Sequence, residues 1–355
     1  MIPIAKPLLG EEEKQAVCEV IDSGMIASGP KTVEFEQQFA QFVQAQYAVA
    51  TTSGTTALHL ALHALGISAG DEVILPSFSF IATANAVLFC GGTPVFCDVD
   101  PKTFTLDPQK IESLITEKTK GIMPVHLYGQ PADMDPILKS AADHDLFVVG
   151  DAAQAHGAEY HGIPVGSFGD CECFSFYPTK NMTTGEGGMV TTNKKELFER
   201  LQSLRNHGRM KTNWGYEHGF LGYNYRMTDL SAAIGLVQLQ KLPAYNKKRR
   251  ENAQYLNEQL HEKQVETPFV LPDVKHVYHQ YTIKCQDREQ VIAQLKAKEV
   301  GFGIYYPKPL HQYSHLQTYG HENLTVSEEL SQQVLSLPVH PLLSQQDLET
   351  IVSCF

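Results

Sequence analysis

The chain has 355 residues, and its 28 Lys and Arg against 40 Asp and Glu give a net charge of −12 at pH 7 with His counted as neutral. This acidic balance repels nucleic acid and anionic membrane surfaces, so we expect neither as a partner. With 43% hydrophobic residues the chain can bury a large core, and its length predicts one large domain with a smaller one.

Short β-rich runs recur along the first 192 residues. Val73–Leu75 and Phe147–Val149 are apolar on both faces, which is typical of strands that helices cover on both sides. The predicted strands are Tyr47–Thr51, Glu72–Pro76, Pro94–Asp98, Gly121–His126, Leu146–Gly150, Glu172–Phe176 and Gly188–Thr192. They predict a three-layer α/β domain with a mostly parallel sheet of about seven strands.

Helices are expected in the connections that parallel strands require, at Thr55–Leu65, Lys110–Ile115 and Asp135–Asp143. A long apolar helix over Met227–Leu242 has Thr228 as its expected N-cap, and Pro243 ends or kinks it.

The character of the chain changes after Pro243. A polar helix that contains the basic run Lys247–Arg250 is followed by a strand-like Tyr281–Cys285 and a helix over Arg288–Glu299. We interpret the basic run as a solvated helix face. The sequence thus predicts a large domain over residues 1–242 and a small α+β domain over residues 243–355.

No segment has the character of a signal peptide or a membrane span. The apolar segment before Glu11–Glu13 is too short for a signal peptide, and Phe80–Cys97 is interrupted by Asn85, Gly91, Gly92 and Pro94. We therefore expect a cytoplasmic protein. Its seven cysteines have no paired framework and should be reduced thiols; Cys171 and Cys173 have no second ligand pair nearby, so no metal is expected.

Three segments carry residue types that chemistry requires. Ser53-Gly54-Thr55-Thr56 follows a strand and opens a helix, so its free N–H groups and the helix dipole would favour a phosphate, although the same residues serve as ordinary N-caps. Asp151 ends a buried strand, where open α/β sheets bind ligands, or it caps the next segment. Lys180 follows another strand and precedes the glycine-rich Gly185–Gly188, which would let the backbone pass close to a bulky ligand.

The order and spacing of these segments resemble pyridoxal 5′-phosphate (PLP) enzymes of fold type I. More narrowly, the chain resembles the DegT/DnrJ/EryC1/StrS family of sugar aminotransferases from about residue 2 to its C-terminus. The segments that carry the resemblance are Gly29-Pro30, Ser53–Leu58, Gly70–Ile74, Asp151–Gln154, Ser175–Lys180 and Gly222–Met227.

The resemblance implies a role for each matching position. Lys180 matches the lysine that holds the cofactor as a Schiff base, and Asp151 matches the carboxylate that faces the pyridine nitrogen. Phe80 matches the aromatic residue stacked on the ring, and Gln154 the residue beside its 3′-oxygen. Gly54, Thr55 and Ser175 match phosphate contacts, and Asn224 matches a phosphate ligand that comes from the second subunit of a homodimer.

The resemblance also implies the reaction. PLP would cycle with pyridoxamine 5′-phosphate, taking nitrogen from an amino acid such as glutamate and delivering it to a nucleotide-linked keto sugar in polysaccharide biosynthesis. One branch of the family has histidine at the lysine position and catalyses dehydration, so Lys180 favours transamination. Two alternatives stay open: a cyclitol ketone aminated with glutamine, and a regulatory relative without turnover.

Substrate contacts are expected toward the C-terminus. Ile304–His311 is similar to the family's tyrosine-proline stretch near the sugar site, which suggests Tyr306, Lys308 and His311 as substrate-binding residues or as structural loop residues. Arg226 could bind a phosphate or carboxylate with two hydrogen bonds, or form an ion pair at an interface.

Overall fold

The fold is built around one seven-stranded sheet. The structure is a computed structural model and describes residues 1–320 and 323–355. The strand order is β1-β9-β8-β5-β4-β2-β3, and all pairs are parallel except those that β9 makes with β1 and β8. The seven strands are β1 (Tyr47–Thr51), β2 (Glu72–Pro76), β3 (Thr93–Cys97), β4 (Thr119–Ile122), β5 (Phe147–Asp151), β8 (Cys171–Ser175) and β9 (Gly188–Thr192).

Helices cover both faces of this sheet. The buried side chains of α2 (Pro30–Phe42), α5 (Met134–Asp143) and the first half of α7 (Asp229–Leu260) form one core with one face. Those of α3 (Gly54–Ala64), α4 (Ile81–Phe89) and α6 (Lys195–Arg205) form a second core with the other face. The three-layer fold of type I is thereby confirmed, because the apolar strand residues find partners on both sides.

The predicted helix over Lys110–Ile115 is replaced by two 3₁₀ turns, Pro108–Lys110 and Glu112–Leu114. Pro108 and the Asp107 side chain, which accepts from the Gln109 N–H, favour a short turn here.

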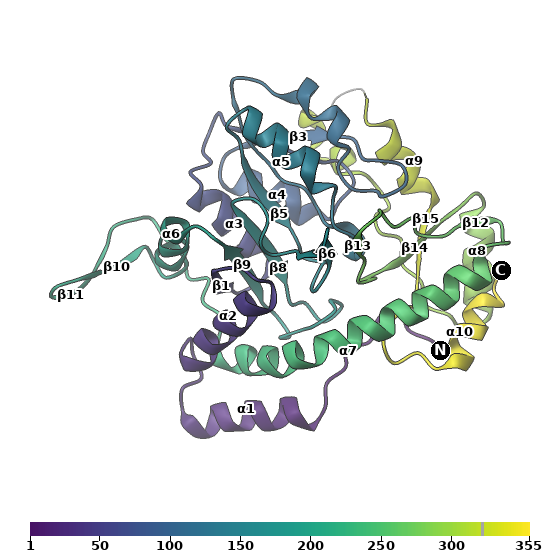
Figure 1. Cartoon of the computed structure of the whole chain (residues 1–355), viewed down its shortest axis with the longest axis horizontal. Helices are drawn as coiled ribbons and strands as arrows, with labels where there is room; N and C mark the ends of the chain where they lie inside the picture. The colour runs from purple at the N-terminus through teal and green to yellow at the C-terminus, as the bar shows by residue number, and fades with distance from the viewer. Residues whose placement is uncertain (321–322) are drawn as a thin grey trace.

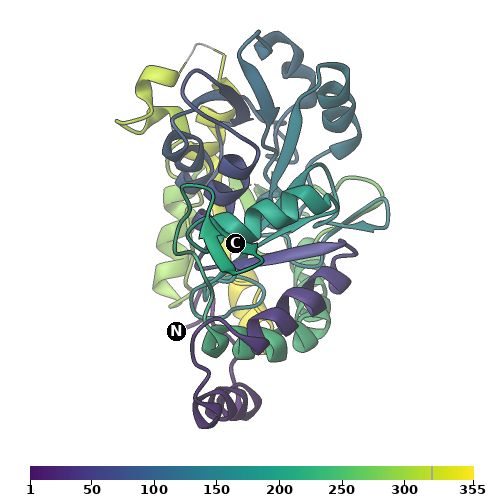
Figure 2. The ribbon, with the colours of Figure 1, turned by 90° about the vertical axis from the view of Figure 1, so that its left-hand side faces the viewer.

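Pro243 does not end the long helix, since α7 runs from Asp229 to Leu260. Leu242 and Tyr245 on either side of the proline are buried, and α7 packs against both α2 and α1 (Glu11–Ser23). This packing compensates for the hydrogen bond that proline removes. The predicted domain boundary at 243 therefore falls within one helix. Figure 1 shows this helix passing beneath the sheet toward the C-terminal part of the chain. Helix α1 lies at the periphery of the molecule (Figure 2).

The basic run Lys247–Arg250 lies on α7 and is only partly a solvated face. Arg249 is buried and donates hydrogen bonds to the carbonyl oxygens of Tyr278 and His279. The interpretation as a solvated face is wrong for this residue.

The C-terminal part has its own apolar cluster around a small sheet of order β12-β14-β15. Its elements are β12 (Val265–Glu266), β14 (Tyr281–Cys285), β15 (Val334–Leu337), α8 (Arg288–Ala297), α9 (Thr325–Gln333) and α10 (Gln345–Val352). In another small sheet, β6 (Glu159–Tyr160) pairs with both β13 (Val274–Lys275) and β7 (Ile163–Pro164), and its pairing with β13 links the two parts of the chain.

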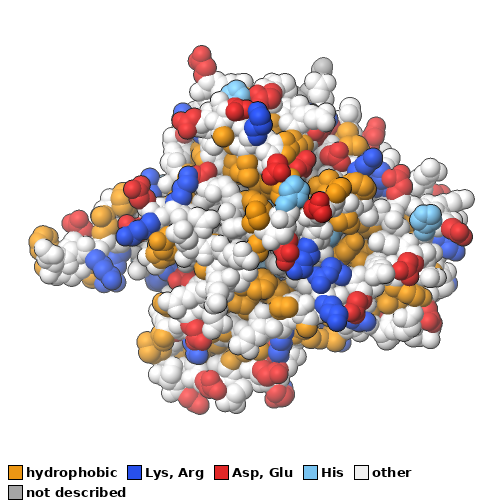
Figure 3. Space-filling model, viewed as in Figure 1, with side chains coloured by type: hydrophobic (Ala, Val, Ile, Leu, Met, Phe, Trp, Pro, Cys, Tyr) orange, Lys and Arg blue, Asp and Glu red, His pale blue; other side chains and the backbone are white. Residues whose placement is uncertain are grey.

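A hairpin of β10 (Arg209–Thr212) and β11 (Gly215–His218) projects from the body of the molecule (Figure 1). Trp214 in its turn is 83% exposed and Leu221 just beyond it is 81% exposed. Hydrophobic side chains are visible at its tip (Figure 3). Among the helices of residues 1–320 and 323–355, none has the length and apolar character needed to cross a membrane.

Candidate active site

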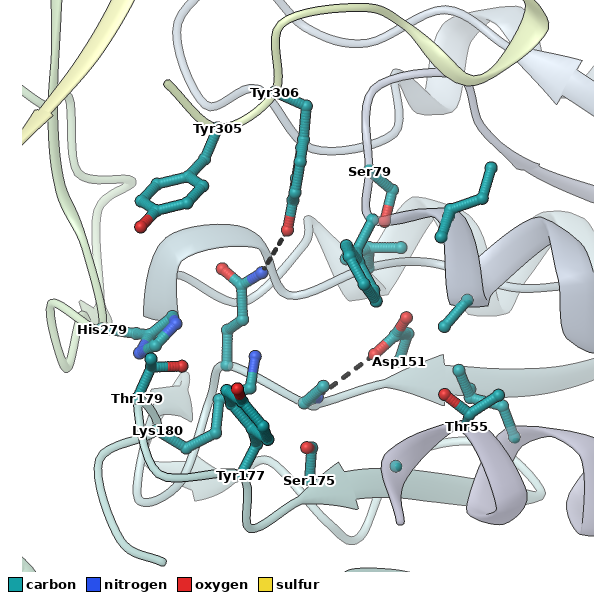
Figure 4. A pocket seen from close by; sticks show the side chains of 18 of the residues that line it. Thr55, Ser79, Asp151, Ser175, Tyr177, Thr179, Lys180, His279, Tyr305 and Tyr306 are labelled. Atoms are coloured by element: carbon teal, nitrogen blue, oxygen red, sulfur yellow. Dashed lines mark hydrogen bonds between the residues drawn. The ribbon is translucent and has the colours of Figure 1, made fainter. Parts of the chain in front are cut away.

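A cavity of about 640 Å³ lies at the carboxyl ends of the central parallel strands. Its walls come from the β1–α3 turn, the β2–α4 connection, the ends of β5 and β8, and the segment Ile304–Pro307 far along the chain. Figure 4 shows that Asp151, Lys180 and Tyr306 extend from three different segments toward the same space. This is the position at which open α/β sheets bind ligands.

Asp151 is the last residue of β5 and is buried. Its carboxylate accepts from the Thr83 hydroxyl at 2.8 Å and from the Ala153 N–H at 3.2 Å. Burial raises the pKa of this carboxyl, and the two donors oppose that shift. A carboxylate held in this way can stabilise a cation that enters the cavity beside it.

Lys180 lies in the turn that follows β8, where its N–H donates to the Tyr177 carbonyl at 2.9 Å. Burial lowers the pKa of its amine to about 8, while Asp151 acts in the opposite direction. The structure gives this amine no hydrogen bond or ion pair with any residue in 1–320 and 323–355. A lysine that loses its proton near neutral pH in a cavity can act as a nucleophile and as a base.

The β1–α3 turn faces the same cavity. Ser53 caps α3 by accepting from the Thr56 N–H at 3.1 Å, which leaves Gly54 and Thr55 at the start of the helix. A Cβ atom on Gly54 would lie 2.6 Å from Cβ of Ser175, so only glycine allows α3 to begin this close to β8. Gly54, Thr55 and Ser175 all line the cavity, where helix N–H groups favour an anion.

The glycine-rich segment after Lys180 meets the cavity at Glu186, but Gly188 of this segment has a different role from the predicted one. A Cβ atom on Gly188 would lie 2.2 Å from the Ser53 carbonyl oxygen. Gly188 therefore permits a close approach between the backbone of β9 and the backbone of the β1–α3 turn. It does not line the cavity, so it is not needed for contact with a ligand.

Phe80 and Gln154 complete the part of the cavity expected from the sequence. Phe80 precedes α4 and is 54% exposed, with its ring centroid 6.0 Å from that of Tyr306. Gln154 accepts from the Tyr128 N–H at 2.7 Å and donates to the Tyr306 hydroxyl at 2.9 Å.

These residues fit PLP. The cofactor carries a phosphate, an aromatic ring with a nitrogen that can bear a proton, and an aldehyde that reacts with an amine. The cavity offers a helix N-terminus, an exposed aromatic ring, a buried carboxylate and a lysine of lowered pKa. Each chemical feature of the cofactor thus has a counterpart among the lining residues.

Four predicted residues lie outside the lining of this cavity. Asn224 and Lys308 are exposed. Arg226 donates to the Asn206 side chain at 2.7 Å. His311 is buried and bridges Ser77 and Glu328 at 2.7 and 3.0 Å, so its observed contacts are structural.

Thr83 and Tyr128 also shape the site, and the sequence analysis did not identify them. Thr83 lies in the first turn of α4, three residues after Phe80. This spacing, close to one helical turn, was the sequence feature that could have suggested that Thr83 lies near the site. Tyr128 follows β4, and only its place after a strand could have suggested it.

The fold is that of PLP-dependent enzymes of fold type I, and the residues that line the cavity fit this cofactor. Residues 7–355 match the DegT/DnrJ/EryC1/StrS aminotransferase family, so the chain belongs to this family of PLP-dependent aminotransferases.

Similar proteins agree over the whole length. The chain is 43% identical to GDP-perosamine synthase of Caulobacter vibrioides, with 99% of this chain and 96% of that protein covered. It is 42% identical to a UDP-N-acetyl-3-dehydro-alpha-D-glucosamine 3-aminotransferase of Acidithiobacillus ferrooxidans, with coverage of 97% and 93%. The PLP form of Spr1654 from Streptococcus pneumoniae superposes with a TM-score of 0.94 at 30% identity, covering 99% of this chain and 97% of that one.

Proposed function

We propose that the protein binds PLP at Lys180 and transfers an amino group from an amino acid, glutamate in the first instance, to a nucleotide-linked keto sugar. The observation that carries this proposal is the placement of Lys180 and Asp151 in one cavity with the N-terminus of α3. An intact lysine and carboxylate also argue against a regulatory protein without turnover, because a binding module needs no base.

The chain's own residues would divide the work. When bound, the cofactor supplies a protonated ring that withdraws negative charge from the substrate carbon. Asp151 keeps the ring nitrogen protonated through its charge. The α3 N-terminus and Ser175 hold the phosphate. Lys180 would hold the cofactor through its amine, and the same amine would serve as the base that moves a proton during the transfer.

The names of two relatives support the sugar substrate. One is a GDP-perosamine synthase, and the other acts, by its name, on a UDP-linked 3-dehydro sugar. A protein of charge −12 needs local donors and cations to bind a nucleotide diphosphate. Arg226, Lys308 and the lining residues Tyr305–Pro307 are our candidates for this end of the site.

We expect a nucleotide-linked keto sugar to be aminated with a kcat/KM about a hundredfold above that of the same sugar without its nucleotide, a difference of roughly 2.7 kcal/mol in transition-state binding. The reason is that remote contacts to the nucleotide orient the keto group beside the cofactor. Steady-state rates with glutamate and with glutamine as donors, on both acceptors and on a cyclitol ketone, provide the measurement. Equal rates with the free sugar or the cyclitol ketone would refute the nucleotide-sugar substrate and leave the PLP site intact.

We further propose that the protein is a homodimer in which Asn224 completes the site of the partner. Asn224 is exposed and lies outside its own cavity, while Tyr225 packs back on α3 with its hydroxyl 3.1 Å from Nδ1 of His59. The exposed Trp214 in the hairpin and Leu221 just beyond it supply apolar surface for such a contact.

Co-expression of Lys180→Ala and Asn224→Ala chains tests the shared site. A mixed dimer would contain one doubly defective and one intact site, so random pairing should restore about a quarter of the wild-type sites. The parent variants, expressed separately, are the controls. A fully active monomer in sedimentation, or a mixture no more active than its parents, would refute the arrangement.

A further inference from the structure

Tyr128 holds two walls of the cavity together. It is buried at the turn after β4, with a backbone φ of 58°. Its N–H donates to the Gln154 side-chain oxygen at 2.7 Å, and its hydroxyl donates to the Tyr305 carbonyl. One residue thereby fixes the amide beside Asp151 and the segment that carries Tyr306.

This arrangement determines which way the hydrogen bonds run. A backbone N–H can only donate, so the Gln154 oxygen must face Tyr128 and the Gln154 nitrogen must face Tyr306. An amide nitrogen also only donates, so the Tyr306 hydroxyl accepts this bond at 2.9 Å. The hydroxyl proton of Tyr306 consequently points away from Gln154.

The cavity is the remaining direction for that proton. Tyr306 lines it together with Asp151 and Phe80, and the Tyr306 ring packs edge-on against Phe78. Figure 4 shows the hydroxyl at the inner end of the side chain, above the space that Lys180 and Asp151 enter. Burial and the nearby Asp151 both raise the pKa of Tyr306, which keeps the hydroxyl protonated.

We propose that Tyr306 donates a hydrogen bond to an acceptor oxygen of the ligand in this cavity, and that Tyr128 and Gln154 are positioning residues that hold it in the donor role. The inference rests on the proposed function. The acceptor has two sources, the phenolic oxygen on the cofactor ring or the carbonyl oxygen of the keto sugar, and both are oxygens that a neutral hydroxyl can stabilise.

Tyr306→Phe removes the donor and keeps the ring. If the acceptor is the cofactor oxygen, loss of the donor disfavours the deprotonated form of the cofactor. The visible absorbance of the substrate-free holoenzyme should then change at a pH midpoint about one unit higher, which is a tenfold change in the proton equilibrium. Tyr305→Phe removes a hydroxyl from the same wall and should leave the midpoint in place. If the acceptor is the carbonyl oxygen of the sugar, the pH midpoint of the absorbance should not change. The KM for the keto sugar should instead rise about tenfold, while the KM for the amino donor stays the same.

Gln154→Glu reverses the hydrogen bond without touching Tyr306. One carboxylate oxygen still accepts from Tyr128, and the other accepts from Tyr306, which turns the hydroxyl away from the cavity. Because the added negative charge also raises the midpoint, the decisive comparison is the double variant: adding Tyr306→Phe to Gln154→Glu should change the same quantity by less than about twofold.

The donor role alone would be overturned by the following result. The wild-type protein shows a visible band with PLP, and the Tyr306→Phe variant has the same melting temperature, the same pH midpoint and the same KM as the wild type. A wild-type protein that binds no PLP would overturn the proposed function and this inference together.

Discussion

Replacing Lys180 with alanine or arginine is expected to lower kcat by about 10⁴-fold, because one side chain both anchors the cofactor and moves the proton. Arginine keeps a positive charge in the cavity but cannot act as a nucleophile at any accessible pH. Both variants should lose the visible band that the wild-type protein forms with PLP, and borohydride should trap the cofactor on a wild-type peptide that contains Lys180.

The pH dependence of attachment provides a second measurement. Since burial lowers the pKa of Lys180 to about 8, the amine is neutral above this pH and protonated below it. The rate at which the band appears on adding PLP to the apoprotein should rise through pH 8 and then level off. Trapping on a different lysine would contradict the assignment.

Asp151→Asn is expected to lower kcat by about 10³-fold, since it removes the charge that keeps the ring nitrogen protonated and leaves the shape of the side chain unchanged. The amide oxygen can still accept from the Ala153 N–H, and the amide nitrogen can donate to the Thr83 hydroxyl oxygen, so the melting temperature should change little. Steady-state kinetics and the absorbance spectrum of the holoenzyme are the measurements.

Asp98→Asn is the matched control for this change. Asp98 is also buried, and it follows another strand of the same sheet, but its carboxylate accepts from the N–H groups of Val326 and Ser327 at the start of α9. Its replacement should cost about 1 kcal/mol of stability as a lost cap and leave the absorbance spectrum unchanged. A kcat of Asp151→Asn within tenfold of the wild type would contradict the role of Asp151.

The sheet and the polar floor of the cavity were predictable because local patterns determine them. Strands buried on both faces have continuous apolar runs, and all seven predicted runs lie in the central sheet. Asp151 ends such a run, and Gly54 and Lys180 lie within a few residues of the ends of two others, so the carboxyl edge of the sheet brings them together in one cavity.

The remaining wall depends on contacts between distant parts of the chain. Tyr306 reaches Gln154 across 152 positions, and Tyr128 reaches Tyr305 across 177 positions. No periodicity encodes such pairs. The passage of α7 through Pro243 has the same origin, because packing against α1 and α2 outweighs the local cost of proline.

The attachment of the segment around Tyr306 has a consequence for how the site meets its ligands. Leu310 donates its N–H to the Ser77 carbonyl at 2.6 Å, His311 bonds the Ser77 hydroxyl, and α9 starts on Asp98. All three anchors belong to the large sheet and its loops, and two backbone hydrogen bonds between Gly303 and Ser336 also join this wall to β15 of the small sheet. The pocket is therefore preorganised, and little of the binding free energy of a sugar has to be spent on drawing its two sides together.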